Sequence, residues 1–371
     1  MAFQKIALTM AAASCLLLAG CGEDTTTDKK AEKAVASTEP LKAAWVYPSP
    51  RAGWSKQHEE ARMLIEQKYG DKIRTQVVDN VTNTVDAERV IRDLAAQGNK
   101  IIFATSFTYM NPALKVAKEF PDVKFENCTG YKTAANYSNY NARFYQARYL
   151  AGKLAASMSK TAHLGYVAAM PIPEVLQGIN AYTLGAQSVN PDVKVSVVWT
   201  NTWYDPGKEV DATNTLIGQG CDILTHHTDS TAVPATAESR GVKVISYHSA
   251  MTKTAPKQLI GAVTHHWDEY YAHRIQALYD GKWKVESVWG GAELHMVCLS
   301  AIAPGAPKSV VEDINAVYSK MEKKEFNVFS GPIVDNEGKV QIPEGKVADD
   351  KMLNTMNYFV KGVIGKVPTG K

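Results

Sequence analysis

Ala43-Ala44-Trp45-Val46-Tyr47 decides the fold class, because it is a short run of apolar and aromatic residues that ends in a loop containing Pro48, Pro50 and Gly53. Such a run is typical of a buried strand in a parallel sheet. A helix-length amphipathic segment follows at 56–69, and strand and helix patterns then alternate along the chain. This alternation predicts βαβ units and an α/β fold.

The expected elements fall into two series. In the first series we expect strands at 43–47, 76–78, 100–105 and 123–126 and helices at 56–69, 85–97, 112–119 and 143–159. In the second we expect strands at 163–168, 193–199, 223–225 and 242–247 and helices at 173–188, 207–219 and 232–239. The remaining expected elements are strands at 261–264, around Val288 and at 326–333, and helices at 268–279, 308–323 and 352–363. Because the two series repeat one plan, they predict two similar lobes with a ligand cleft between them.

The N-terminus has the features of a lipoprotein signal peptide. Lys5 supplies a positive charge, an apolar run extends from Ile6 to Leu18, and small residues precede Cys21. The run is shorter than the about 20 residues that a membrane span needs. We therefore expect residues 1–20 to be removed and Cys21 to be lipidated, with an ordinary secretory peptide as the alternative. The polar residues up to position 40 predict a flexible tether over 21–40.

The remaining chain, about 330 residues, is too long for one compact core and predicts two domains. We expect a first lobe over 41–160 plus about 264–298, and a second lobe over 161–263 plus about 299–371.

Charge and cysteine content exclude several functional classes. The formal net charge is +3, from 41 basic and 38 acidic residues, and there is no basic block that would follow a phosphate backbone. Nucleic-acid binding is therefore not expected. Cys128, Cys221 and Cys298 would remain after processing, each in or beside an apolar run. We expect three buried free thiols, with one disulfide plus one free thiol as the alternative. The absence of a CxxC motif gives no support to a zinc or redox site.

Eight short motifs, each occurring once, follow one another along the mature chain. They are Gly53-Trp54, Tyr149-Leu150-Ala151-Gly152, residues 163–167 (HLGYV), 171–175 (PIPEV), 190–195 (NPDVKV), 205–208 (DPGK), 220–224 (GCDIL) and 329–333 (FSGPI). In this order they resemble the basic membrane protein lipoproteins, the purine-nucleoside-receptor-like binding proteins of ABC transporters. The resemblance covers almost the whole mature chain.

The resemblance implies a type I periplasmic-binding-protein fold, with two Rossmann-like lobes, a hinge of three crossovers and an interlobe ligand cleft. It also implies a binding protein rather than an enzyme, without a cofactor, that delivers a purine to ABC permease and ATPase subunits. We expect a monomer, lipid-anchored to a membrane and facing the periplasm or the exterior.

Aromatic residues follow several of the expected strands. Trp54, Phe107, Tyr109, Trp203 and Trp267 are the candidates for stacking on a planar heterocycle. Stacking of one base on an aromatic ring contributes about 1–3 kcal/mol. The alternative for each ring is a place in the core. We expect Trp54 and Trp203 to bind, because their Gly- and Pro-flanked loops cannot bury them easily.

The polar candidates for ligand binding are Glu126, Asn127, Asp229, His248 and His265. Asp229 comes shortly after an expected strand, where an α/β sheet presents side chains to a ligand. A carboxylate at this place could accept a hydrogen bond from an exocyclic amine or a ring N–H. The alternatives are capping of the next helix for Asp229 and burial against a cation for Glu126.

The histidines bear on which purine is bound. Nucleoside-binding members of the family are similar to one another in holding ribose with an aspartate and a lysine, and the corresponding positions here are His248 and His265. The resemblance therefore favours a free nucleobase such as adenine, with a purine nucleoside second.

A metal site, an enzyme and a sensory or adhesive module are the alternatives to a purine receptor. The adjacent pairs His226-His227 and His265-His266 suggest a metal site, but neighbouring side chains of a strand point in opposite directions, so none is expected. A nucleoside-processing enzyme is a second class, but the chain has no nucleophile elbow or phosphate loop. A sensory or adhesive module of the same fold remains an alternative.

The signal peptide generates a prediction. Cys21→Ser should abolish acylation and release the protein from membranes, because its thiol is the expected site of lipidation. Intact mass and partitioning into Triton X-114 measure this. A variant that keeps the mass of two or three acyl chains would contradict it.

Overall fold

The structure is a computed structural model and describes residues 39–368. The expected signal peptide, the lipidated Cys21 and nearly all of the expected tether lie outside these residues. No helix within the described range is both long and apolar enough to cross a membrane.

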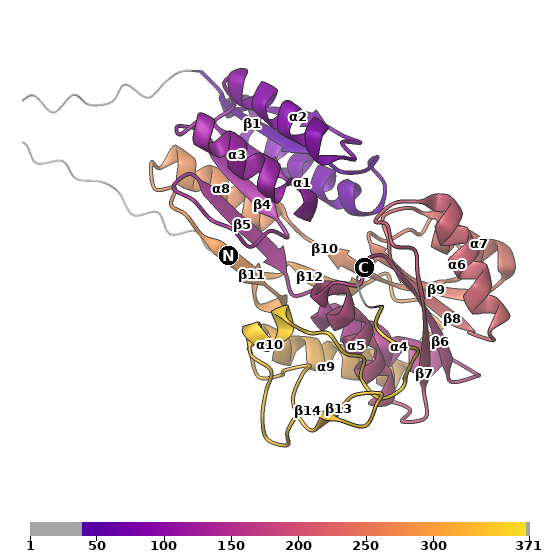
Figure 1. The fold of residues 1–371 in the computed structure, drawn as a ribbon. Helices are drawn as coiled ribbons and strands as arrows, with labels where there is room; N and C mark the ends of the chain where they lie inside the picture. Colours follow the sequence, from indigo (N-terminus) through magenta and orange to yellow (C-terminus); the bar gives the residue numbers. More distant parts are fainter. Residues whose placement is uncertain (1–38, 369–371) are drawn as a thin grey trace, which may run out of the picture. The chain divides into compact units, whose positions relative to one another are not determined.

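The first lobe is built on a sheet of six parallel strands. Their order is β2 (Ile73–Val78), β1 (Leu41–Val46), β3 (Ile101–Ala104), β4 (Lys124–Cys128), β5 (Tyr137–Ala142) and β11 (Ser287–Gly290). The helices of this lobe are α1 (Gly53–Tyr69), α2 (Thr84–Ala96), α3 (Met110–Glu119) and α8 (Asp268–Tyr279), with short 3-10 turns η1 (Gly70–Lys72) and η2 (Phe107–Tyr109). In Figure 1, α8 lies beside α1, although the second lobe separates them in sequence.

Strand β1 shows why the opening run is apolar on both sides. Ala43 and Trp45 pack with residues of α1 and α8 on one face of the sheet. Ala44 and Val46 pack with residues of α2 and α3 on the other face. Because successive side chains of a strand point to opposite faces, a strand covered on both sides needs apolar residues at every position.

The second lobe repeats this plan in a sheet of seven strands. Their order is β12 (Val297–Ser300), β10 (Leu259–His265), β9 (Lys243–His248), β8 (Ile223–His227), β6 (His163–Ala168), β7 (Lys194–Trp199) and β15 (Val363–Ile364). All neighbours are parallel except β10 and β12. The helices are α4 (Tyr145–Met158), α5 (Pro173–Gln187), α6 (Pro206–Gly218), α7 (Ala232–Arg240), α9 (Lys308–Glu322) and α10 (Asp350–Asn354), and β13 (Ile333–Val334) pairs with β14 (Val340–Ile342).

Both sheets share one doubly wound strand order, 2-1-3-4-5 when each lobe's strands are numbered from its own start. Three connections join the lobes in the described chain: residues 143–144 after β5, 266–267 after β10, and 291–296 after β11, which include the turn η3 (Ala292–Leu294). The expected two-lobed α/β fold is confirmed.

The lobe boundary differs from our expectation at α4, which we placed in the first lobe. Helix α4 packs on α5 and belongs with the second sheet. Glycines allow this close contact: a Cβ atom on Gly152 would lie 1.9 Å from the carbonyl oxygen of Tyr182, and one on Gly185 would lie 1.9 Å from that of Tyr149. The Tyr149–Gly152 motif is therefore a helix-packing motif, which helical periodicity alone does not assign to a lobe.

Other expected elements are also corrected. The helix expected over 352–363 is replaced by the short α10, which ends at Asn354, and the chain continues without helix to β15. The reason is Asn180, whose side chain hydrogen-bonds the backbone of Tyr358 and Val360. The strand expected at 326–333 is reduced to β13. Strand β5 was not expected, because its sequence YSNYNA is polar, although most of its residues are buried.

Candidate functional site

A cavity of about 910 Å³ lies between the loops of the two lobes. From the first lobe, its walls come from loops after β1, β3 and β4 and from residues of β5 and β11. From the second lobe, they come from loops after β6, β7 and β8, from the last residues of β8 and β9, and from α5 and α10. Most of these segments lie at the carboxyl ends of parallel strands, where doubly wound folds bind ligands.

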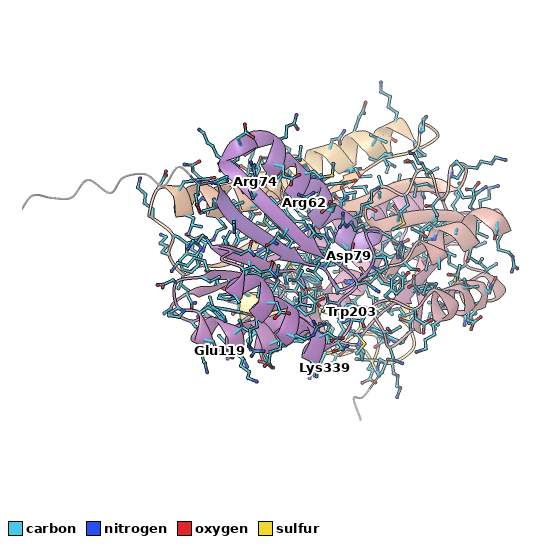
Figure 2. The ribbon with its side chains drawn as sticks, turned by 90° about the horizontal axis from the view of Figure 1, so that it is seen from above. Arg62, Arg74, Asp79, Glu119, Trp203 and Lys339 are labelled. Atoms are coloured by element: carbon cyan, nitrogen blue, oxygen red, sulfur yellow. The ribbon has the colours of Figure 1, made fainter. Side chains whose placement is uncertain are left out.

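Trp54 and Trp203 both line the cavity, one from each lobe. Trp54 is in the first turn of α1, not in a loop as expected, and is only 7% exposed. Its indole N–H donates to the carbonyl of Thr105, at 2.7 Å, which fixes the ring. Trp203 is half-buried in the loop after β7 and is labelled in Figure 2. Its carbonyl accepts from the amide of Asp229 at 2.9 Å, so this loop is tied to the one after β8.

More exposed rings surround the cavity. Phe107 lines it as expected, with its ring centroid 6.4 Å from that of Tyr131, which is largely exposed. Tyr204 and Trp289 also line it. Sequence reasoning missed these three further rings, although Tyr204 follows Trp203 directly and could have been included on that ground.

Asp229, in the loop after β8, and His248, the last residue of β9, both line the cavity. Nε2 of His248 lies 3.2 Å from the Asp229 carboxylate. Burial, assisted by the negative charge of Glu209, raises the pKa of Asp229 well above its usual range. Burial, assisted by the neighbouring His265, lowers the pKa of His248 well below its usual range. Both directions favour a neutral pair. Asp229 does not cap α7, because Ser230 accepts the amide of Ala232 there.

Glu174 is a cavity residue that sequence reasoning quoted in a motif but did not place in the site. It lies in the first turn of α5 and accepts a hydrogen bond from Asn141 of β5, at 3.0 Å, so this bond joins the two lobes. Burial raises the pKa of Glu174 to about 7, against the opposing effect of Asn141. Nε2 of His227 lies 3.8 Å away. Glu174 is a carboxyl group that follows an expected strand, as Asp229 is, and it could have been predicted on the same ground.

The two lobes touch beside the cavity. Gly53 has a φ of +43°, and a Cβ atom there would lie 2.3 Å from the carbonyl oxygen of Asp229. The next residue, Trp54, contacts His248 edge-on with ring centroids 5.4 Å apart. The two lobes are therefore in direct contact at this place, and glycine at position 53 permits it.

Five of the predicted ligand-binding residues do not line the cavity. Tyr109 is buried and donates its hydroxyl to the carbonyl of Val81. Asn127 is buried and donates to the carbonyls of Ala104 and Ser106, so it shapes the loop after β3. Both side chains point away from the cavity and donate to backbone carbonyls that would otherwise be unpaired.

His265 and Trp267 lie behind Trp54. Trp267 is fully buried and stacks on His58, with ring centroids 5.0 Å apart. His265 is buried against Phe144, with ring centroids 4.5 Å apart. His265 at the end of β10 and Trp267 in the connection after it support the position of Trp54, a packing role that their place at the end of a strand did not reveal.

The fifth residue that does not line the cavity is Glu126. The geometry supports its alternative interpretation, burial against a cation. Its carboxylate is fully buried and accepts hydrogen bonds from Arg274, Tyr270 and Trp283, each at 2.7 Å. Arg274 is also fully buried. The pair joins β4 to α8 inside the first lobe, away from the cavity.

The three cysteines within residues 39–368 are free thiols, as expected; Cys128 and Cys221 are buried, but the expected burial of Cys298 is wrong, because this residue is partly exposed. Within residues 39–368, no group of three or more His, Cys, Asp or Glu side chains is arranged to hold a metal ion.

Comparison with known proteins identifies relatives of the whole described chain. A family described as ABC transporter substrate-binding protein, PnrA-like, matches residues 42–337. A purine-binding protein of Brucella abortus is 47% identical over 90% of this chain and 96% of its own. A provisional ABC transporter glucose-binding protein of Haloferax volcanii is 34% identical over 89% of this chain and 82% of its own.

A solved structure has the same fold. An ABC transporter solute-binding protein from Conexibacter woesei, 21% identical, superposes with a TM-score of 0.65 over 77% of this chain and 98% of its own. The family match confirms the expectation of a binding protein rather than an enzyme.

The Glu126–Arg274 pair generates a prediction. Glu126→Ala should lower the free energy of unfolding by about 3–5 kcal/mol, because it leaves a buried guanidinium without its main partner. Urea denaturation measures this. Glu119→Ala is the control, since it breaks a solvent-exposed pair with Arg92 and should change the free energy of unfolding far less. A loss below that of the control would contradict the structural role.

Proposed function

Because the chain belongs to the Bmp family of PnrA-like ABC transporter substrate-binding proteins, we propose that its cavity captures a purine, and that a free nucleobase such as adenine is preferred to a purine nucleoside. Proteins of this class work outside the cytoplasmic membrane and hand their ligand to a permease. We further propose that Cys21 anchors the protein by lipid, on the support of its signal sequence alone.

The observation that carries the purine proposal is the combination of aromatic rings with neutral acceptors in one cavity. Trp54 and Trp203 approach it from opposite lobes, which suits a flat ring held between them. Two such stacking contacts at about 1–3 kcal/mol each supply much of the about 8 kcal/mol of a micromolar complex. The Brucella relative, named as purine-binding, supports the same ligand class.

The polar groups support a ligand rich in N–H donors. Asp229 and Glu174 project carboxyl groups into the cavity, and within residues 39–368 neither pairs with a lysine or arginine. A ligand N–H that donates to one of these carboxyl oxygens adds a hydrogen bond worth about 0.5–1.5 kcal/mol, so a ligand with such donors is favoured. Adenine presents an exocyclic amine and a ring N–H at its edge.

The preference for a base over a nucleoside rests on His248. This imidazole lines the cavity where nucleoside-binding members resemble one another in placing a carboxylate for ribose. A neutral, bulkier ring at this place removes an acceptor for the sugar hydroxyls. His265 is buried behind Trp54, so its contribution would be through the position of that indole.

The ligand itself can be identified by isothermal titration of the soluble body with adenine, adenosine, guanosine, hypoxanthine and glucose. We expect adenine to bind tightest, in the micromolar range or below. Trp203→Ala should weaken adenine binding about 10- to 100-fold, through loss of one stacking contact. Tyr279→Ala is the control, since this exposed ring lies outside the cavity.

Two outcomes would decide against this assignment. Tighter adenosine than adenine binding would reject the nucleobase preference and keep the purine proposal. Glucose binding without purine binding would reject the purine proposal altogether.

Closure of the lobes gives a further prediction. Gly53→Ala should weaken ligand binding at least about tenfold, because a Cβ atom would collide with the Asp229 carbonyl and hold the lobes apart. Small-angle X-ray scattering should then show no compaction on adding adenine. Gly70→Ala is a matched control: its φ of +53° imposes similar backbone strain, but a Cβ atom there meets nothing within 4 Å. Normal compaction of Gly53→Ala would show that the contact does not limit closure.

A further inference from the structure

The C-terminal segment contributes to the cavity, although the family match ends at residue 337. Helix α10 lies in this segment and is fixed to α5 of the second lobe. The side chain of Gln177 donates to the carbonyl of Leu353 at 2.9 Å, and the Leu353 side chain is buried in the core of that lobe. The helix is therefore a built part of the cavity wall.

Helix α10 presents Asp350 and Asn354 to the cavity, four residues apart on one face. Asp350 accepts two hydrogen bonds from the guanidinium of Arg143, at 2.8 and 3.0 Å, one to each carboxylate oxygen. Arg143 lies in the first connection between the lobes. This two-bond geometry is the one by which arginine binds carboxylates and phosphates alike.

Other groups hold Arg143 in place without Asp350. Its Nε donates to the carbonyl of Trp289 at 3.2 Å, and its Nη1 donates to the hydroxyl of Tyr145 at 3.1 Å. The guanidinium carbon also lies 4.2 Å from the centroid of the Trp289 ring. Removal of Asp350 would therefore leave a positioned cation at the cavity wall.

Arg143 is also the one lysine or arginine among the described residues that line the cavity. The acidic residues there are Glu174, Asp229 and Asp350. Burial lowers the pKa of His227 and His248, so these imidazoles are neutral. An anionic ligand therefore meets acceptors and carboxyl groups, while the only permanent cation is already paired.

We propose that α10 is a charge filter for the ligand site: Asp350 occupies Arg143, and the cavity consequently rejects phosphorylated purines and admits uncharged ones. The filter rests on the proposed purine function.

The test compares binding of adenine, adenosine monophosphate and inorganic phosphate to the wild type and to Asp350→Ala. Isothermal titration measures the purines, and competition against bound adenine measures phosphate. The readout is the ratio of the dissociation constants of adenosine monophosphate and adenine, which a general weakening of the site does not change. We expect Asp350→Ala to shift this ratio at least about tenfold toward the nucleotide, or to gain competition by phosphate, since a freed guanidinium forms charge-assisted bonds with phosphate oxygens.

Two further variants separate the filter from a change of overall charge. Glu344→Ala removes the same charge from an exposed position outside the cavity and should leave the ratio unchanged. Arg143→Met combined with Asp350→Ala should abolish the gain, because it removes the freed cation.

The possible outcomes are distinct. If the wild type binds adenine but Asp350→Ala gains nothing for either phosphate probe, the filter is wrong. Wild-type binding of adenosine monophosphate as tight as that of adenine also overturns it. If the wild type binds no purine, the proposed function itself fails.

Discussion

The approach of the first turn of α1 to the connection after β8 is the constraint on which the site depends. At Gly53 the backbone comes so close to the Asp229 carbonyl that no side chain fits between them. That contact brings Trp54 over His248 and sets Asp229 at the wall of the cavity. The cavity therefore exists in this form only because one residue of the first lobe has no Cβ atom.

The second principle of the site is that burial shifts four of its ionisable groups toward the neutral form, whereas Arg143 and Asp350 form an ion pair. The pKa of Asp229 and Glu174 is raised by desolvation, and that of His227 and His248 is lowered by it. Desolvation disfavours the charged form of every group, so acids and bases converge on the uncharged state. A pocket of neutral donors and acceptors between aromatic rings matches an uncharged heterocycle better than it matches an ion.

Much of the fold could be predicted from the sequence, because local patterns determine it. The doubly covered strand β1 and, apart from the polar β5, the alternation of elements up to β10 follow from apolar periodicity. The lobe of α4 and the extended chain after α10 could not be predicted, since they depend on the contacts of Gly152 with Tyr182 and of Asn180 with the backbone of distant residues.

The candidate site was predicted in part for the same reason. Trp54, Phe107, Trp203, Asp229 and His248 follow strands and reach the cavity. Glu126 and His265 also follow or end strands, yet they point to buried partners, Arg274 and Phe144. Position after a strand selects the right end of the sheet, but the direction of a side chain there depends on partners far away in the sequence.

The reciprocal packing of α4 and α5 has a mechanical consequence. Gly152 of α4 and Gly185 of α5 each pack against a backbone carbonyl of the other helix. The two helices therefore form one tightly packed unit. Helix α4 starts directly after the first connection between the lobes, and α5 starts at Pro173, so that Glu174 lies in its first turn. A bend in that connection therefore moves α4 and α5 together, and with them the Glu174 carboxyl group in the cavity wall.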